Sequence, residues 1–141
     1  MRYVETSLRG RGLVKGRARG EALVCHHPIS FLGGVDPETG TILEGGHELE
    51  GLSVKGRILV FPYGKGSTVG SYTLFAMAKK GTKPAGIINL KTEPIIAAGC
   101  VLANIPLIDM LEANPVEVIS TGDFVMMDAC RGIVLLRHPS T

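Results

Sequence analysis

The pattern of hydrophobic residues predicts a strand, a turn and a helix in the middle of the chain. Residues 58–61 are four consecutive apolar residues, which is typical of a buried strand. Pro62 and the glycines after it end this strand, because proline lacks a backbone donor and glycine weakens strand structure. Apolar residues then recur at helical spacing until Lys79-Lys80-Gly81, a typical helix end. Three residues at the start can cap this helix: Ser67, Thr68 and Ser71.

Apolar runs after this helix predict two more buried strands, at 84–90 and 105–109. Between them we expect a short helix from Glu93 to about Leu102, with Thr92 as its cap. Strands that alternate with helices indicate some parallel pairing in this part of the chain.

The two ends of the chain are richer in strands. Segment 1–25 is punctuated by glycines and predicts two short strands, whereas 41–56 predicts a loop with one short strand. The apolar runs 124–127 and 133–136 predict a hairpin. We therefore expect one α/β domain over residues 1–141, with barrel-like β layers and helices on one side.

Composition and charge narrow the classes of function. The chain has 141 residues, of which 45% are hydrophobic and 20% are charged, and its net charge is only +2. We therefore expect no strong attraction to nucleic acid or to a membrane surface. No apolar run is long enough to span a bilayer and no signal-peptide pattern is visible, so a cytoplasmic location is expected. A basic amino-terminal segment is expected to form a solvated strand face: Arg9, Arg11, Lys15, Arg17 and Arg19.

The residues that bind metals in proteins are widely spaced in this sequence. The cysteines are Cys25, Cys100 and Cys130, and no pair has the close spacing of a zinc or redox site. His26 and His27 lack the i, i+4 spacing of helical ligands, and His47 and His138 are isolated. We therefore expect buried thiols, structural or solvent-facing histidines, and no metal or cofactor bound by this chain.

The turn between residues 61 and 70 does not match the common phosphate-binding or hydrolase motifs. In the Walker motif Ser or Thr follows the lysine directly, but here Gly66 separates Lys65 from Ser67. The dinucleotide motif needs glycine where Val69 stands, and the spacing of a nucleophile elbow is absent. A nucleotide enzyme or a serine hydrolase is therefore weakly supported.

Two interpretations of this turn stay open on physical grounds. Backbone N–H groups of residues 66–68, the helix dipole and Lys65 can bind an anion, or Ser67 can simply cap the helix. A helix terminus stabilises an anion by at most about 2 kcal/mol, which is too little to make the Ser67 hydroxyl a strong base near neutral pH. If Ser67 is catalytic, further positive charge has to come from another chain.

The turn and a second motif together resemble a known family. The second motif is Gly33-Gly34-Val35-Asp36-Pro37-Glu38-Thr39-Gly40, in which Asp36 is expected to stabilise a turn and the glycines to allow a close approach. With residues 62–71, it resembles the aconitase X swivel domain family, over nearly the whole chain. The resemblance implies a swivelling β/β/α domain that closes over a large aconitase-like subunit and contributes an active-site serine.

Within that family the chain is most similar to separate small subunits from archaea. That similarity implies a hydro-lyase subunit, active only with its large subunit, that dehydrates (R)-5-phosphomevalonate to trans-anhydromevalonate 5-phosphate in isoprenoid biosynthesis. A [4Fe–4S] cluster is then expected on the large subunit. Two alternatives are kept: a dehydratase subunit for another hydroxy acid such as hydroxyproline, and a non-catalytic module whose turn binds an anion.

The resemblance also implies roles for residues of the turn. Aconitase-type swivel domains carry Gly-Ser-Ser-Arg here, with the first serine as base; Ser67 matches that serine, and Thr68 takes the place of the second. Val69 stands where the arginine would be. Ser67 is therefore the expected catalytic base, and Gly64, Lys65, Gly66 and Thr68 are the expected substrate-binding residues. Lys65, an amino-terminal arginine or the large subunit would replace the missing arginine.

Overall fold

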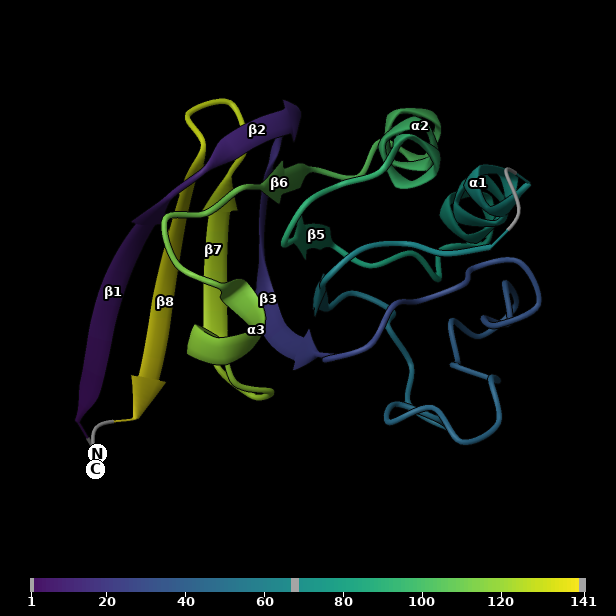
Figure 1. Ribbon diagram of the computed structural model, residues 1–141, viewed down its shortest axis with the longest axis horizontal. Helices are drawn as coiled ribbons and strands as arrows, with labels where there is room; N and C mark the ends of the chain where they lie inside the picture. The colour runs from purple at the N-terminus through teal and green to yellow at the C-terminus, as the bar shows by residue number, and fades with distance from the viewer. Residues whose placement is uncertain (1, 67–68, 140–141) are drawn as a thin grey trace.

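The fold of the chain is seen in a computed structural model that describes residues 2–66 and 69–139. Figure 1 shows a sheet with two helices packed on one side of it. The elements in chain order are β1 (Tyr3–Arg9), β2 (Arg11–Val14), β3 (Arg17–Val24), β4 (Ile58–Phe61), α1 (Gly70–Lys80), β5 (Gly86–Asn89), α2 (Pro94–Ala103), β6 (Leu107–Asp109), α3 (Pro115–Val118), β7 (Phe124–Asp128) and β8 (Ile133–Pro139).

The strands form one sheet with a parallel and an antiparallel half. The strand order is β1-β8-β7-β3-β4-β5-β6-β2. β3 belongs to both halves: residues 17–21 pair antiparallel with β7, and residues 22–24 pair parallel with β4. The parallel half continues through β5 and β6, and its edge strand β2 is antiparallel. β1 and β2 stand at opposite ends of the order, so the layers are an open sheet and not a closed barrel.

Two hydrophobic cores lie on the two faces of the parallel half. Side chains alternate across a strand, so Ile58 and Val60 of β4 belong to the core shared with the antiparallel half. Leu59 and Phe61 belong to the other core, with Leu74 of α1 and others from α2. The result is three layers in which the parallel strands are buried between the antiparallel strands and the helices. This arrangement confirms the expected β/β/α architecture.

Most predicted elements are present, and the differences have local causes. Segment 1–25 forms three strands instead of two, because the chain changes partner on either side of Gly10, from β8 to β6. Segment 41–56 contains only isolated bridges and no strand. The one-turn helix α3 was not predicted; the Asn114 side chain caps it by accepting a hydrogen bond from the Val116 N–H. The predicted hairpin is confirmed by the β7–β8 pairing.

Two of the expected helix caps, Ser71 and Thr92, were wrong, and the other two, Ser67 and Thr68, lie outside the described residues. α1 begins at Gly70, with Val69 in the cap position. α2 is capped by Glu93 and not by Thr92, whose N–H and hydroxyl are bonded to Asp109 and Asn89. Within the described residues, no helix combines the length and apolar character needed to cross a bilayer.

Candidate active site

The candidate site lies where the parallel strands end. In open α/β sheets, ligands bind beyond the carboxyl ends of the strands. Three connections leave from these ends: the glycine-rich loop from β4 to α1, the segment from β5 to α2, and the segment after β6. The Leu90 N–H donates to the Pro62 carbonyl (3.1 Å) and the Met110 N–H donates to the Leu90 carbonyl (3.2 Å), so the three connections are joined at their starts.

The first half of the glycine-rich loop is held by the segment that follows β3. Gly64 forms a parallel bridge with Ile29, and the Lys65 N–H donates to the Ile29 carbonyl at 3.0 Å. On its other side, Gly64 lies against the start of α2. A Cβ atom at this position would be 2.5 Å from Cγ1 of Ile96 and 2.7 Å from Oε1 of Glu93. Any side chain at residue 64 would therefore push the loop away from α2.

Gly66 is required by both its conformation and its surroundings. Its φ angle is +99°, in a region that residues with a side chain rarely adopt. A Cβ atom here would lie 2.7 Å from the Ser30 hydroxyl oxygen. Gly64 and Gly66 thus give the loop a compact path. The next two residues, Ser67 and Thr68, which the sequence assigns to catalysis and binding, lie outside the described residues.

The amino-terminal end of α1 is suited to an anion. The first helical turn contains no acidic residue, and the valine in the cap position has a side chain that cannot accept a hydrogen bond. The first N–H groups of a helix and its dipole favour negative charge. Both basic residues of α1, Lys79 and Lys80, are in its last turn, where they complement the negative end of the dipole.

Lys65 is the described cation that lies on the loop itself. Its Nζ is 3.3 Å from Oε2 of Glu44, and its side chain is 47% exposed. An exposed pair of this kind contributes little to stability, so the lysine can exchange its partner for a substrate anion at small cost. Lys65 is therefore a candidate for the replacement of the missing arginine.

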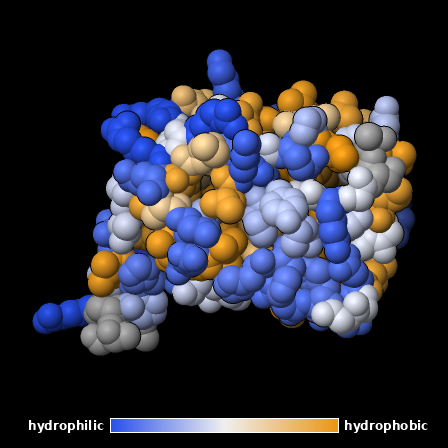
Figure 2. All heavy atoms as spheres, in the orientation of Figure 1, coloured by the Kyte–Doolittle hydropathy of each residue, from blue (hydrophilic) through white to orange (hydrophobic). Residues whose placement is uncertain are grey.

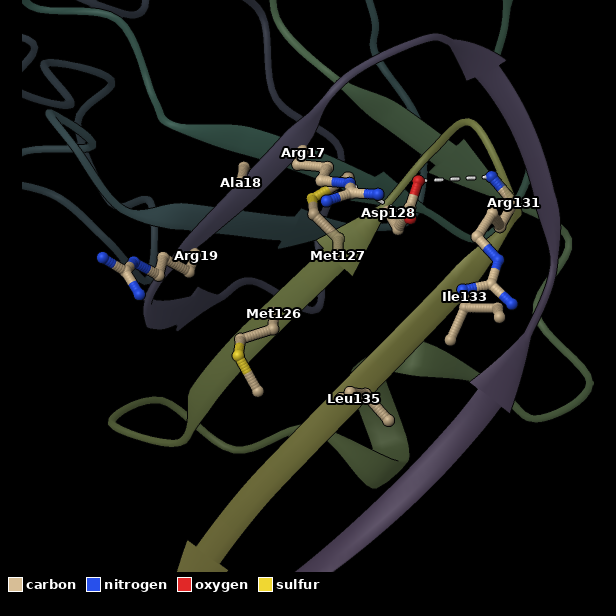
Figure 3. Close-up of a pocket in the computed structure, with 9 residues that line it drawn as sticks. All are labelled: Arg17, Ala18, Arg19, Met126, Met127, Asp128, Arg131, Ile133 and Leu135. Carbon is tan, nitrogen blue, oxygen red and sulfur yellow. Dashed lines mark hydrogen bonds and ion pairs between the residues drawn. The ribbon is translucent and has the colours of Figure 1, made fainter.

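The amino-terminal arginines whose ion pairs are described lie at two places, Arg11 at the end of β6 and Arg17 on the antiparallel half of the sheet. Arg11 binds Asp109 through two hydrogen bonds of 2.9 Å, and Arg17 lies 3.3 Å from Asp128. Arg17 and Arg19 line a groove on the outer face of β3, β7 and β8, and Met126 and Leu135 continue this lining across β7 and β8 (Figure 3). This groove lies on the antiparallel half of the sheet, across from the loop between β4 and α1 (Figure 1).

A buried polar cluster supports the ends of β5 and β6. Asp109 is fully buried, and it accepts hydrogen bonds from Arg11 and from the Thr92 N–H at 2.8 Å. Burial alone would raise the pKa of Asp109, but these hydrogen bonds and the Arg11 charge outweigh it and the pKa is lowered. Asn89, also fully buried, donates to the Phe61 carbonyl at 3.0 Å and so fixes the end of β4. These contacts keep the start of the loop in place.

A second polar cluster, next to the supporting segment, was not predicted. It consists of Cys25, His26, His27, His47 and Glu48. The 26–56 segment folds back, so that Glu48 accepts hydrogen bonds from His26 and His27. His47, which is isolated in the sequence, has a structural contact here, since its Nε2 lies 3.5 Å from the Cys25 sulfur. Only the pair of adjacent histidines hinted at this cluster, because its other members come together through long-range folding.

The contacts within the second cluster shift the pKa values of Glu48 and Cys25. Partial burial would raise the pKa of Glu48, but hydrogen bonds from His26, His27 and Cys25 bring it down to about 2. Burial, together with the negative charge of Glu48, raises the pKa of Cys25 to about 12. The metal-free thiol is therefore protonated at neutral pH.

The cysteines of this chain do not fit an iron–sulfur cluster. Such clusters are held by several converging thiolates. Cys25 follows β3, Cys100 is buried in α2, and Cys130 is exposed in the β7–β8 turn. Among the described residues, no group of metal-ligating side chains contains more than one cysteine.

The 33–40 motif has the structural role expected for it. Asp36 accepts hydrogen bonds from the Glu38 N–H (2.9 Å) and the Thr39 hydroxyl (3.2 Å), which is typical of a stabilised turn. A Cβ atom at Gly34 would be only 2.1 Å from the Ser30 carbonyl oxygen. The motif thus positions Ser30, which contacts Gly66 of the loop.

The molecule's surface around the helices is partly apolar. Figure 2 shows apolar residues exposed along the upper edge of the molecule, over α2. Val101 and Leu102 of this helix are 65% and 46% exposed, and Tyr72 of α1 is 64% exposed. By contrast, polar residues dominate the lower right of Figure 2, over the 26–56 segment.

The three-layer fold and the glycine-rich loop at the carboxyl end of the parallel strands define a swivel domain of the aconitase type. Residues 7–136 match the family model described as the aconitase X swivel domain, and the chain belongs to this family.

Curated relatives and a solved structure agree with this assignment. The chain is 50% identical to the phosphomevalonate dehydratase small subunit of Methanosarcina acetivorans, over 96% of this chain and 94% of the relative. It is 54% identical to the same subunit of Methanocella arvoryzae, over 92% and 98%. The crystal structure of Thermococcus kodakaraensis aconitase X in its holo form matches with a TM-score of 0.88 and 44% identity, covering 93% of this chain and 98% of that chain.

Proposed function

We propose that this chain is the small subunit of a phosphomevalonate dehydratase, a hydro-lyase of isoprenoid biosynthesis. The observation that carries the proposal is the identity of 50% and 54% to two curated small subunits over almost their whole lengths. In this proposal, residues 1–141 act as one swivel domain in the cytoplasm, in a heterodimer with a large aconitase-like subunit. The chain alone is inactive, because it contributes only half of the site.

The loop between β4 and α1 is the part of the chain that meets the substrate. Gly64, Lys65, Gly66 and Thr68 bind the anionic substrate, and Ser67 is the base. The support is the compact path of the two glycines, the amino-terminal end of α1 without an acidic residue, and the weakly paired Lys65. This site is suited to a substrate that carries both a phosphate and a carboxylate.

The reaction removes water from (R)-5-phosphomevalonate and forms trans-anhydromevalonate 5-phosphate. Ser67, in its alkoxide form, takes the proton from the carbon next to the carboxylate. The electron pair of that C–H bond forms the double bond, and the neighbouring C–O bond breaks. The hydroxide that leaves takes up a proton and is released as water, which balances the proton transferred to Ser67. The positive end of α1 and Lys65 stabilise the negative charge at this end of the site.

A [4Fe–4S] cluster on the large subunit would supply a Lewis acid for the leaving hydroxyl. Three residues of this chain position the base relative to the large subunit, because they contact the loop: Ile29, Ser30 and Ile96. Closure of the swivel domain excludes water and completes the site.

The proposal is tested by reconstitution. The chain is co-expressed with its large-subunit candidate, and the purified complex is incubated with (R)-5-phosphomevalonate. We expect dehydration by the complex and none by either subunit alone. A stable complex that dehydrates hydroxyproline and not phosphomevalonate would move the assignment to the other hydroxy acids. A chain that binds phosphate but supports no turnover in any complex would instead favour a non-catalytic module.

A further inference from the structure

A set of metal-ligating atoms lies next to the loop in a part of the chain that the dehydratase reaction does not use. The Cys25 sulfur, a ring nitrogen of His27 and a carboxylate oxygen of Glu48 are all within 4.8 Å of one another. Atoms bound to one Zn²⁺ ion lie about 3 to 4 Å apart, because each is roughly 2.0–2.3 Å from the ion. Small side-chain rotations are sufficient to bring these three atoms to that spacing.

The geometry points to a Zn²⁺ site formed by Cys25, His27 and Glu48. Thiolate, imidazole and carboxylate are the donor types that Zn²⁺ prefers. In the metal-free arrangement these groups bind each other: Nδ1 of His27 is 2.8 Å from Oε1 of Glu48, and the Cys25 thiol donates to the His27 carbonyl at 3.0 Å. Zn²⁺ replaces the shared protons of such a cluster, since its ligands bind in deprotonated form.

Two neighbouring histidines orient the ligands from outside. The His47 Nδ1 accepts a hydrogen bond from the Leu49 N–H at 3.1 Å, so its Nε2 carries the proton and faces the Cys25 sulfur. This N–H stabilises a thiolate bound to the metal. His26 lies 3.2 Å from Oε2 of Glu48 and holds the second carboxylate oxygen. The fourth position on the metal is then open to water.

An ion can reach the proposed site from solvent, and a bound ion would stabilise the backbone beside the loop. Cys25 is buried, whereas His27 and Glu48 are exposed, so an ion can reach the thiolate from solvent. The ligand-bearing segment continues directly into Ile29 and Ser30, which contact Gly64 and Gly66 of the loop. A bound ion therefore fixes the strip of backbone on which the loop rests. The site itself is independent of the proposed reaction.

The test is metal binding by the isolated chain after treatment with a chelator. We expect one Zn²⁺ per chain in a calorimetric titration, and with Co²⁺ an absorption band typical of a thiolate ligand. Cys25→Ser, His27→Ala and Glu48→Gln should each weaken Zn²⁺ binding by about 100-fold or more, and His47→Ala by roughly 10- to 100-fold. Cys25→Ser should also abolish the Co²⁺–thiolate band.

Matched controls keep the test decisive. Cys100→Ser and His138→Ala remove a buried thiol and a histidine outside the cluster, and we expect neither to change the affinity. Glu48→Gln changes an exposed side chain, so it gives an answer even if Cys25→Ser does not fold. Zn²⁺ binding that is equal in the wild-type chain and in Glu48→Gln, or no binding by the folded wild-type chain, would overturn the proposal.

Discussion

The two longer helices begin in opposite ways, although both follow strands of the parallel half. At the start of α2, the Glu93 carboxylate accepts hydrogen bonds of 2.8 Å from the N–H groups of Ile95 and Ile96. The protein thus fills this helix end with its own negative charge, and Pro94 occupies the first turn. At the start of α1, the first turn holds no acidic residue and the cap position holds Val69.

The contrast separates a helix end that is capped by a carboxylate of the chain from one that, in the proposed function, meets the substrate. Both ends have the dipole that attracts an anion. At the start of α2 the anion is the Glu93 carboxylate of the chain itself, so this helix end only stabilises the fold. The end of α1 follows the glycine-rich loop and has no acidic side chain in its first turn, so in the proposed function its dipole acts on the substrate. Gly64, in this loop, lies against the start of α2, next to Glu93 and Ile96.

The largest effect is expected from removing the base at the α1 end. Ser67→Ala in the reconstituted enzyme should lower kcat by about 10²- to 10⁴-fold, because it removes proton abstraction by a positioned group. The measurement is steady-state kinetics with (R)-5-phosphomevalonate. Ser71→Ala, which changes a serine inside α1, is the control and should have a much smaller effect. Near wild-type turnover by Ser67→Ala would exclude Ser67 as the base.

The next effect tests the contact between the glycine-rich loop and the start of α2. Gly64→Ala places a Cβ atom 2.5 Å from Ile96, so the loop must move away from α2. We expect a loss of about 1–3 kcal/mol in the free energy of unfolding and a fall in kcat/KM of about 10²-fold. Gly45→Ala is the matched control, because no atom lies within 4 Å of its added Cβ. Equal activity in both variants would show that the loop position does not matter for catalysis.

A third variant gives the start of α1 a carboxylate, like the one that Glu93 supplies at the start of α2. Val69→Asp places a negative charge at the positive end of α1, which should stabilise the chain by about 0.3–1 kcal/mol. The same charge should repel the substrate and raise KM by about tenfold, roughly 1.4 kcal/mol of binding. Val69→Asn is the control: it has a neutral side chain of similar size and should leave KM unchanged. Similar KM values for both variants would contradict an anion site at this helix end.

The smallest effect concerns the start of α2, which the Glu93 carboxylate caps. Glu93→Ala removes the cap of α2 and should reduce the free energy of unfolding by about 1 kcal/mol, measured by urea denaturation. Glu93→Gln retains one acceptor oxygen and should lose less. An unchanged stability in Glu93→Ala would show that the carboxylate does not hold this helix end.

The sequence predicted the central strands and helices of the core well, because these elements depend on local pattern, whereas the β/β/α layering was implied by the family resemblance. The run 58–61 has both faces buried, as its continuous apolar character predicted, and the helix over residues 70–80 ends at Gly81 as expected. These elements follow from the spacing of apolar residues and from turn chemistry. The glycine-rich loop was likewise visible from its sequence.

Features set by distant contacts could not be predicted. Thr92 has the side chain of a helix cap, but Asp109 binds its N–H and Asn89 accepts from its hydroxyl, so Glu93 caps α2 instead. The Cys25–Glu48 cluster depends on a long segment that folds back through turns with no regular strand. Such pairings have no local signature in a single sequence.

The most direct test of the central claim, that the α1 end and its loop form the base-bearing half of an active site, is a structure of the two-subunit enzyme. The Ser67→Ala variant, crystallised with (R)-5-phosphomevalonate, should retain unreacted substrate. The account predicts an anionic group of the substrate on the first N–H groups of α1. It also predicts that the carbon to be deprotonated lies within about 4 Å of residue 67. Substrate bound at the outer groove of β3, β7 and β8, with the loop remote from it, would contradict the account.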